Sequence, residues 1–321
     1  MLHISPKLEH RDIAIILGTG AEKLGELGIR TKGPIELSVT YSVLGEEKTG
    51  RAEVYDAEVG GVPIYLLSRH SSKGAYTPAY KIDHTPNILA LIDDDHGAGS
   101  KVILASSLVG GCRTTDWEIG DIILVEDGID MHGDDLYVDG NEPYIHAHGL
   151  FNRRVSKILL EKAGQMGIDV LDGGIYYSGP DTTGNRFETP AEMAKLLAPA
   201  YLRKYLATIA KELQMQPLDN FMHLYGMDKL EPNLVGMTLV REAGYVRAFS
   251  TRSKGYKNEN VDKNKHLAKF AGFAVISDFP ESEETAHETN VGVALGKLPI
   301  IMEIFAEAVP TIQKELSDGQ L

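Results

Sequence analysis

The chain has 321 residues, of which 43% are hydrophobic and 24% are charged. These proportions are typical of globular proteins, and they exclude a collagen-like chain and a wholly disordered one. The formal net charge of −14 argues against broad binding to nucleic acid or anionic membranes, but it allows a local pocket for one small anion.

The cysteine content and the hydropathy pattern indicate a compartment. Cys112 is the single cysteine, so an internal disulfide and a cysteine-rich zinc site are both excluded. The sequence has no apolar run of about 18 residues, the length that a membrane-spanning helix needs. Residues 1–12 also lack the apolar segment of a signal peptide. We therefore expect a cytoplasmic protein with no membrane span.

Short apolar runs rich in Ile and Val recur along the chain, and we predict that they form strands. Continuous apolar runs are typical of strands buried on both faces, as in a sheet that helices cover. One pair of runs, 52–59 and 62–67, is joined by Gly60-Gly61 and predicts a hairpin. The apolar run 63–67 lies within that hairpin. The other predicted strands are 13–17, 102–105, 121–125, 174–177, 234–237 and 273–276.

Helical periodicity is clearest in three stretches, which are 155–166, 190–213 and 285–316. Together with the strands they predict an α/β protein with a mixed central sheet flanked by helices. We find no internal repeat and no low-complexity linker, so we predict a single domain over residues 1–321. Three polar stretches rich in turn residues are expected to be surface insertions, namely 130–148, 214–232 and 251–266.

Polar residues follow the first predicted strand. Gly18, Thr19 and Gly20 would let backbone N–H groups approach an anion, and Thr19 would add a hydroxyl donor. A plain tight turn is an equal alternative. A dinucleotide fingerprint needs a third glycine where Lys23 stands, so a nicotinamide-dependent dehydrogenase is only a minor hypothesis.

Two further strands end in residues that suit an anion. Arg69 and His70 follow residues 63–67, and the Arg fork matches phosphate oxygens. A solvated strand end with an ordinary surface arginine is the alternative. Ser107 and then Gly110-Gly111 follow residues 102–105, where the glycines would permit a close approach of the backbone to a ligand or simply form a turn.

A fourth segment offers contacts for a heterocycle. Phe187 could stack on a ring and Glu188 could accept its N–H groups, although Thr189 could equally be a helix cap beside a solvated Glu188. The Asp- and His-rich stretches 93–96 and 130–148 have no recognised spacing of metal ligands. We predict solvated loops there and no metal site.

The order of these motifs along the chain resembles that of the trimeric purine nucleoside phosphorylase and methylthioadenosine phosphorylase family. The resemblance covers most of the chain. Gly18-Thr19-Gly20 is similar to its first phosphate loop, and Arg69-His70 to its second phosphate segment. The other matching segments are 106–111 with 120–122, Gly179-Pro180 with Phe187-Glu188-Thr189, Gly236-Met237-Thr238 with Val240 and Glu242, and 275–278 with His287-Glu288.

This resemblance implies phosphorolysis, in which a nucleoside and phosphate give a purine base and a pentose 1-phosphate. The implied phosphate ligands are Thr19, Arg69, His70, Ser107 and Thr238. The implied base and ribose contacts are Phe187, Glu188, Met237, Asp278 and His287, of which Asp278, His287 and Glu188 are the expected catalytic groups. Phosphate is then a substrate and no cofactor is needed. The implied assembly is a homotrimer whose neighbouring loop, from residues 130–148, closes the sugar pocket.

Some positions depart from the family pattern. Leu108 stands where the family has a small residue whose backbone faces phosphate, and residues 181–185 interrupt a usually compact run. These departures favour a second hypothesis, a non-catalytic protein that binds nucleoside or phosphate.

The implied base contacts do not agree on the substrate. Glu188 matches the nucleoside branch and Asp278 the methylthioadenosine branch. The ring N–H of His287 suits a 5′-hydroxyl, so we predict a purine nucleoside, with methylthioadenosine as the alternative.

Overall fold

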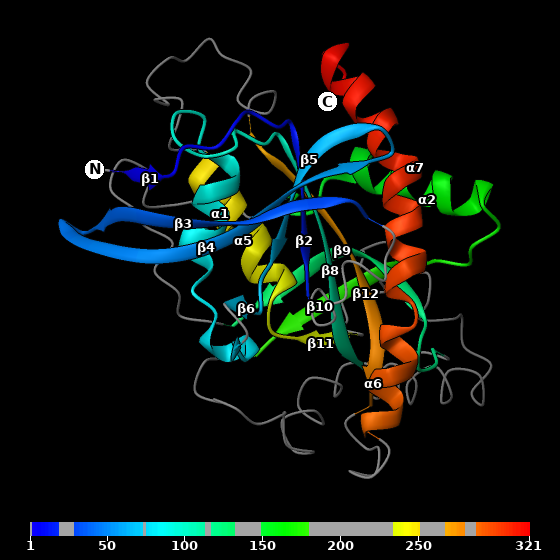
Figure 1. Ribbon diagram of the computed structural model, residues 1–321. Helices are drawn as coiled ribbons and strands as arrows, with labels where there is room; N and C mark the ends of the chain where they lie inside the picture. Colours follow the sequence, from blue (N-terminus) through cyan, green and yellow to red (C-terminus); the bar gives the residue numbers. More distant parts are fainter. Residues whose placement is uncertain are drawn as a thin grey trace, which may run out of the picture.

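The computed structural model describes residues 2–18, 29–72, 75–112, 117–131, 149–179, 234–250, 267–279 and 287–321. Within them a ten-stranded mixed sheet carries helices on both faces, which confirms the predicted α/β class (Figure 1). Its strands are β1 (His3–Ser5), β2 (Ile13–Leu17), β3 (Thr31–Val43), β4 (Glu46–Val59), β5 (Val62–Ser68), β8 (Val102–Gly111), β9 (Ile122–Asp130), β10 (Leu171–Ser178), β11 (Leu234–Gly236) and β12 (Lys269–Asp278).

The remaining described elements are short strands and helices. Strands β6 (Ser71–Ser72) and β7 (Ala75–Tyr76) pair with each other, apart from the main sheet. A 3₁₀ turn spans Ala79–Lys81. The helices are α1 (His84–Ile92), α2 (Arg153–Gln165), α5 (Leu239–Ser250), α6 (His287–Leu295) and α7 (Leu298–Ser317). None of these helices, which are those of the described residues, is long and apolar enough to cross a membrane.

Part of the sheet closes on itself. The strand order is β1-β3-β4-β5-β2-β8-β11-β10-β9-β12, and β12 also pairs with β8. Strands β8, β11, β10, β9 and β12 therefore form a ring, and the other strands extend from β8 as an open sheet. The long β3–β4 hairpin projects from the body on the left of Figure 1.

Two apolar clusters pack on opposite faces of the sheet. Along β8, Ile103 and Ala105 belong to one cluster, and Val102 and Leu104 to the other, as the alternation of a strand requires. Helices α1 and α5 cover the first face, and α2 and α7 cover the second (Figure 1). A Val, Leu, Ile, Phe or Met side chain in these clusters contributes about 1.5–3 kcal/mol when it is fully buried.

Several predicted elements are confirmed, with longer bounds. The hairpin turn at Gly60 and Gly61 has φ of +59° and +76°, the pair of positive values that a two-residue hairpin turn needs. The predicted helix 155–166 is α2. The predicted helix 190–213 and the predicted insertions 214–232 and 251–266 lie outside the described residues, as does 132–148 of the insertion at 130–148.

One prediction and one of two open alternatives are wrong. The predicted helix 285–316 is two helices, because α6 ends at Leu295 and α7 begins at Leu298. Gly110 and Gly111 do not form a turn, because β8 continues through them and pairs with β11. A side chain at Gly111 would meet the ring of Phe279 at 2.6 Å, so this glycine allows close packing.

Candidate functional site

The site begins at a fork in the sheet. On one edge, β8 pairs with β2 from Val102 to Ala105 and with β11 at Gly110 and Gly111. The other edge pairs with β12 throughout. Between these two pairings, none of the described strands pairs with residues 106–109 on the edge of β8 that faces β2 and β11. The backbone N–H and C=O groups of residues 106–109 on this edge therefore need other partners. The carboxyl ends of the parallel strands β2, β5 and β8 meet here, which is where α/β sheets bind ligands.

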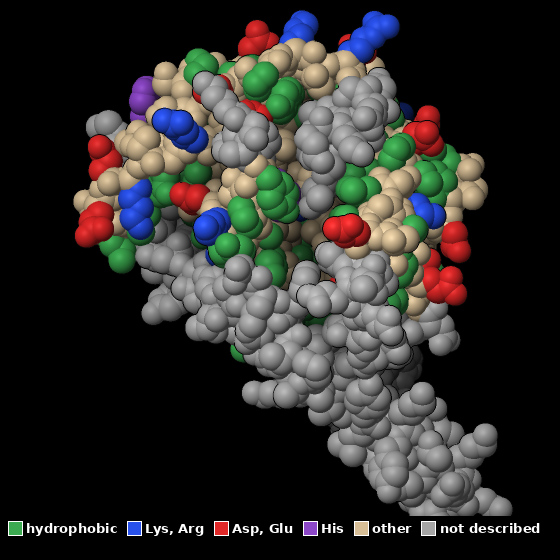
Figure 2. All heavy atoms as spheres, turned by 60° about the horizontal axis from the view of Figure 1, so that its bottom comes forward, with side chains coloured by type: hydrophobic (Ala, Val, Ile, Leu, Met, Phe, Trp, Pro, Cys, Tyr) green, Lys and Arg blue, Asp and Glu red, His purple; other side chains and the backbone are tan. Residues whose placement is uncertain are grey.

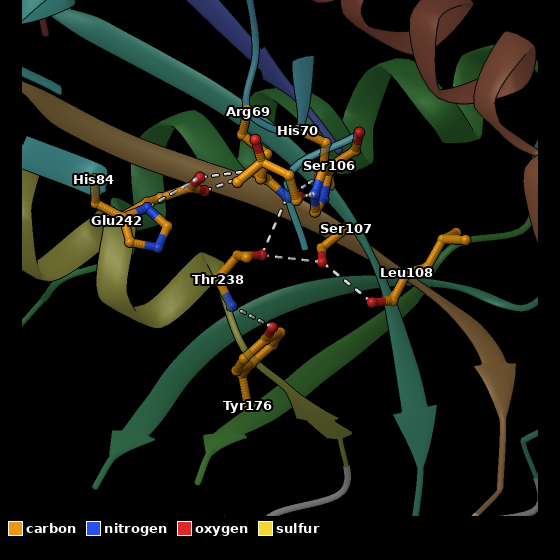
Figure 3. A network of polar contacts seen from close by, with 10 residues as sticks. Arg69, His70, His84, Ser106, Ser107, Leu108, Tyr176, Thr238 and Glu242 are labelled. Carbon is orange, nitrogen blue, oxygen red and sulfur yellow. Dashed lines mark hydrogen bonds and ion pairs between the residues drawn. The ribbon is translucent and has the colours of Figure 1, made fainter. Parts of the chain in front are cut away.

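Arg69, directly after β5, fills the fork. Its Nη1 donates to the carbonyl oxygen of Ser106 at 2.9 Å and to Oγ1 of Thr238 at 3.1 Å (Figure 3). Its backbone N–H donates to the carbonyl oxygen of Leu17, which holds the end of β5 against β2. A side chain at Gly18 would lie 3.0 Å from both Nη1 and the Ser106 oxygen, so glycine permits this contact.

Glu242 neutralises Arg69. Nη2 of Arg69 donates to Oε2 of Glu242 at 2.9 Å, and Nε lies 2.7 Å from Oε1. The two side chains are 1% and 2% exposed, so this is a fully desolvated, two-point ion pair. Burial raises the pKa of the Glu242 carboxyl to about 7, although the charges of Arg69 and Arg241 act to lower it.

Two hydroxyl groups continue the network. The hydroxyls of Thr238 and Ser107 lie 3.2 Å apart, and Ser107 Oγ donates to the carbonyl oxygen of Leu108. Since Thr238 accepts from Arg69, the bonds run in one direction, from the guanidinium through both hydroxyls to that carbonyl. Both fork-edge carbonyls, those of Ser106 and Leu108, are thereby satisfied (Figure 3).

Tyr176 supports the network from below. Its hydroxyl oxygen accepts the backbone N–H of Thr238 at 3.1 Å. The side chain is completely buried, which raises the pKa of its phenol. A side chain at Gly236 would lie 2.0 Å from this hydroxyl, so glycine is required before the Met237-Thr238 bend.

His84 lies beyond Glu242. Its Nδ1 is 3.8 Å from Oε1 of Glu242, and its ring lies beside that of Tyr245 with centroids 5.8 Å apart. His84 is the first residue of α1 and is 2% exposed. Elements α1, α5 and the end of β5 thus bring three ionisable groups into one buried cluster, of Arg69, Glu242 and His84.

The structure brings together three of the predicted phosphate ligands, which are Arg69, Ser107 and Thr238. His70, the next residue after Arg69, is held separately. Its Nδ1 lies 2.8 Å from the carbonyl oxygen of Thr77, and its ring stacks on Tyr76. Thr19, the fifth predicted ligand, lies outside the described residues.

The predicted base and ribose contacts are less completely described. Asp278 ends β12 opposite Gly110, and its Oδ1 accepts the backbone N–H of Phe279. Met237 lies between Gly236 and Thr238 at the bend after β11. His287 begins α6, and its side chain is not described. Phe187 and Glu188 lie outside the described residues.

Leu108 does not point into the network. Its half-buried side chain packs against the apolar cluster that α2 and α7 cover, on the face opposite Ser107 (Figure 3). Adjacent strand residues point to opposite faces, so the leucine itself does not occupy the hydroxyl side of the fork.

The acidic stretch 93–96 is a structured loop. Asp93 directly follows α1, and its Oδ1 accepts the backbone N–H groups of Asp95 and His96. Asp94 forms an ion pair with Lys101. On the face in Figure 2, Lys and Arg side chains of the described residues are interspersed with Asp and Glu, unlike the continuous basic surface of a nucleic-acid-binding protein.

Sequence reasoning gave no role to Tyr176 or His84 and did not identify Glu242 as the partner of Arg69. Tyr176 and His84 lie in buried apolar elements, so their polar groups resemble ordinary core side chains. Glu242 follows Arg241 in a segment that resembles the solvated face of a helix. The structure instead buries nearly all of α5.

No protein-family model matches the chain. It is 31% identical over 153 residues to a protein of Methanopyrus kandleri named probable S-methyl-5′-thioinosine phosphorylase, with 45% of this chain and 54% of that protein covered. It is 31% identical over 163 residues to a probable 6-oxopurine nucleoside phosphorylase of Korarchaeum cryptofilum, with 45% and 56% covered. The chain thus spans about half the length of these two curated relatives.

A third relative matches over most of the chain. The S-methyl-5′-thioadenosine phosphorylase of Pyrobaculum aerophilum is 26% identical over 301 residues, which cover 91% of this chain and 87% of that protein. The fold is similar to the crystal structure of a methylthioadenosine phosphorylase from an antarctic soil metagenomic library, with a TM-score of 0.61 at 19% identity and coverage of 96% and 88%. It is also similar to the purine nucleoside phosphorylase of Schistosoma mansoni in complex with adenosine, with a TM-score of 0.58 at 16% identity and coverage of 93% and 90%.

Proposed function

We propose that this chain is a member of the purine nucleoside phosphorylase and methylthioadenosine phosphorylase family, and that it cleaves the N-glycosidic bond of a purine nucleoside with inorganic phosphate. The products are the free purine base and a pentose 1-phosphate, and the enzyme is a pentosyltransferase. The observation that carries this proposal is the network at the sheet fork, where Arg69, Thr238 and Ser107 converge from three separate segments.

The network offers what an oxyanion needs. The guanidinium of Arg69 is a charged donor, and the hydroxyls of Thr238 and Ser107 could rotate from their present acceptors to donate to an anion. The site excludes bulk water, so hydrogen bonds to an anion would be strongest there. His70 and Thr19 are the further phosphate ligands that we propose. This arrangement would hold one phosphate at the carboxyl ends of the central strands.

The proposed reaction transfers the pentose from nitrogen to oxygen. As the bond between C1′ and N9 breaks, its electron pair moves to the purine and positive charge develops on the sugar. A phosphate oxygen then forms the new bond to C1′, while a donor protonates N7 of the leaving base. Catalysis therefore needs an anion beneath the sugar and a proton donor at the base, because both stabilise the transition state more than the substrate.

We assign the base and ribose contacts to the remaining predicted residues. Asp278 would deliver the proton to N7, and Glu188 would accept an N–H of the purine beside Phe187. Met237 would pack on the ribose, and His287 would bond the 5′-hydroxyl. Phosphate is a substrate in this scheme, and no organic cofactor or metal takes part.

The substrate that we propose is a purine nucleoside with a free 5′-hydroxyl, such as inosine, guanosine or adenosine. A ring N–H of His287 suits that hydroxyl better than an apolar methylthio group. Methylthioadenosine is the second candidate, since relatives of both names match the chain. A higher kcat/KM for methylthioadenosine than for all three nucleosides would establish the second candidate.

We also propose a homotrimer in which residues 130–148 of one copy close the sugar pocket of the next. Light scattering under assay conditions tests this assembly, and a monomer would contradict it. We further propose a cytoplasmic location, because the single cysteine, Cys112, cannot form an internal disulfide.

The decisive experiment measures the loss of inosine, guanosine and adenosine with and without phosphate. We expect phosphate-dependent cleavage with formation of pentose 1-phosphate, and arsenate should replace phosphate because the site recognises a tetrahedral oxyanion. Base release at the same rate without phosphate would identify a nucleosidase. Binding of nucleoside in calorimetry without any product would identify the non-catalytic binding protein that the sequence departures favour.

A further inference from the structure

The guanidinium of Arg69 serves two purposes at the fork. Nη1 donates to Ser106 and Thr238, while Nη2 and Nε face the carboxylate of Glu242. Glu242 therefore already neutralises the positive charge on which an anion at Thr238 would depend. An oxyanion and the Glu242 carboxylate would compete for one buried cation.

The surroundings of Glu242 do not remove this competition. Three charged or titratable groups face its carboxyl, which are Arg69 after β5, His84 on α1 at 3.8 Å, and the adjacent Arg241 on α5. Burial nevertheless outweighs the two arginines and raises the pKa of Glu242 to about 7. A second anion on the same guanidinium would favour the neutral carboxyl still further, because like charges disfavour ionisation.

We propose that Glu242 is a positioning residue of the anion site: it fixes the Arg69 guanidinium, and it takes up a proton when an oxyanion binds beside Thr238. This inference rests on the proposed function, because it takes phosphate as that oxyanion. A protonated Glu242 still accepts a hydrogen bond from Nη2 through its carbonyl oxygen, so the guanidinium stays in place while its charge becomes available to the ligand.

Sulfate is the probe that isolates this effect. It has the tetrahedral shape of phosphate but does not titrate near neutral pH, so any proton taken up on binding comes from the protein. Calorimetry of the full chain with sulfate in two buffers of different ionisation enthalpy counts that proton. We expect close to one proton per sulfate above about pH 8, and an affinity that falls roughly tenfold for each pH unit above the pKa of Glu242.

Two variants at this position separate proton uptake from structural damage. Glu242→Gln should take up no proton from this site, and its sulfate affinity should not vary with pH, so at alkaline pH it binds sulfate more tightly than the wild type does. Glu242→Asp keeps a carboxyl but shortens its reach. It should retain the pH slope while KM for phosphate rises several-fold.

Two control variants complete the design. Glu315→Gln removes another buried carboxyl, which pairs with Arg154 at the end of α7, and it should behave as the wild type does. His70→Gln removes the titratable group that directly follows Arg69 in the chain. It should weaken sulfate binding but keep the proton uptake.

Either of two results would overturn the inference. One is sulfate binding by the wild type without proton uptake. The other is uptake that survives in Glu242→Gln, because the proton would then go to another group, such as His70 or His84. If Glu242→Gln does not fold, the wild type and Glu242→Asp decide the question. Proton-linked sulfate binding without nucleoside cleavage would support the role of Glu242 and refute the phosphorylase activity. Phosphorolysis together with anion binding that takes up no proton would support the phosphorylase activity and refute the proposed role of Glu242.

Discussion

Arg69 and Glu242 lie 173 residues apart in the chain and form a two-point ion pair that is almost completely buried. The pair joins the end of β5 to the first turn of α5, and it lies at the position where the sheet divides. Arg69 is therefore both a proposed anion ligand and a structural tie between distant segments, and its replacement should affect both.

Arg69→Ala should sharply reduce phosphate-dependent turnover and destabilise the protein. The loss of the guanidinium leaves the carboxyl of Glu242 buried without its ion-pair partner, which costs about 3–5 kcal/mol of unfolding free energy. The loss of a charge-assisted hydrogen bond should lower kcat/KM for phosphate by about tenfold or more. Urea denaturation and initial-rate kinetics measure the two effects.

The control for this variant is Arg153→Ala, which removes an exposed ion pair with Glu126. It should change neither stability nor phosphate kinetics noticeably. Unaltered phosphate kinetics in Arg69→Ala would remove Arg69 from the site.

The stability of the protein should depend on the protonation of Glu242. Its pKa is about 7 in the folded protein against 4.5 in an unperturbed carboxyl, so the folded state binds more protons between these values. Its contribution is therefore fully present below about pH 4.5 and is lost as the pH rises through about 7, by about 3 kcal/mol.

Urea denaturation of the wild type and of Glu242→Gln across this range measures the change. The wild type should lose stability relative to Glu242→Gln as the pH rises. A difference between the two proteins that is independent of pH would contradict the shifted pKa.

Tyr176→Phe should weaken phosphate use through Thr238. The substitution leaves the buried backbone N–H of Thr238 without its acceptor, which costs about 1–3 kcal/mol. Because Thr238 also accepts from Arg69, we expect KM for phosphate to rise several-fold. Tyr65→Phe is the matched control, since the Tyr65 hydroxyl accepts the backbone N–H of Glu9 elsewhere in the fold. An equal effect of both variants on KM would mean that Tyr176 acts only on stability.

Leu108→Ala should leave phosphate kinetics unchanged. The leucine side chain packs on the face opposite Ser107, so its truncation removes apolar contacts and costs about 1–2 kcal/mol of stability. Ser107→Ala, by comparison, should raise KM for phosphate. If Leu108→Ala altered that KM as strongly as Ser107→Ala does, the leucine would belong to the anion site.

His287→Val should shift the substrate preference. An apolar side chain at this position favours the methylthio group and leaves a 5′-hydroxyl without its partner. The ratio of kcat/KM for methylthioadenosine to that for inosine should therefore rise. An unchanged ratio would show that His287 does not contact the 5′ position.

Much of the sheet could be predicted because its strands are continuous apolar runs. Strand β3 was not predicted because its residues are mostly exposed or half-buried, so it has no such run. Helix α1 was not predicted for the opposite reason. It is buried on every side, so its sequence shows no amphipathic period. The break between α6 and α7 at Gly296 was missed because apolar periodicity continues on both sides of it.

The site could be predicted only in part. Arg69 was found because it directly follows a strand, and Ser107 because it lies just after the predicted strand 102–105, although β8 in fact continues through it. Thr238 was found only through the resemblance of Gly236-Met237-Thr238 to a segment of the family. The partnership of Arg69 with Glu242 could not be found in this way, since no local pattern encodes a contact across 173 residues. Nor does the sequence show that a helix containing Arg241 and Glu242 is buried.

The ring formed by β8, β11, β10, β9 and β12 also determines how the molecule opens. A closed ring has no free edge from which strands can separate one at a time, so its amide hydrogens should exchange with solvent together and slowly. The outer parts of β3 and β4 have no such protection and should exchange first. Arg69 lies where the open sheet meets the ring, so the network that it organises should remain protected while the projecting hairpin opens and closes.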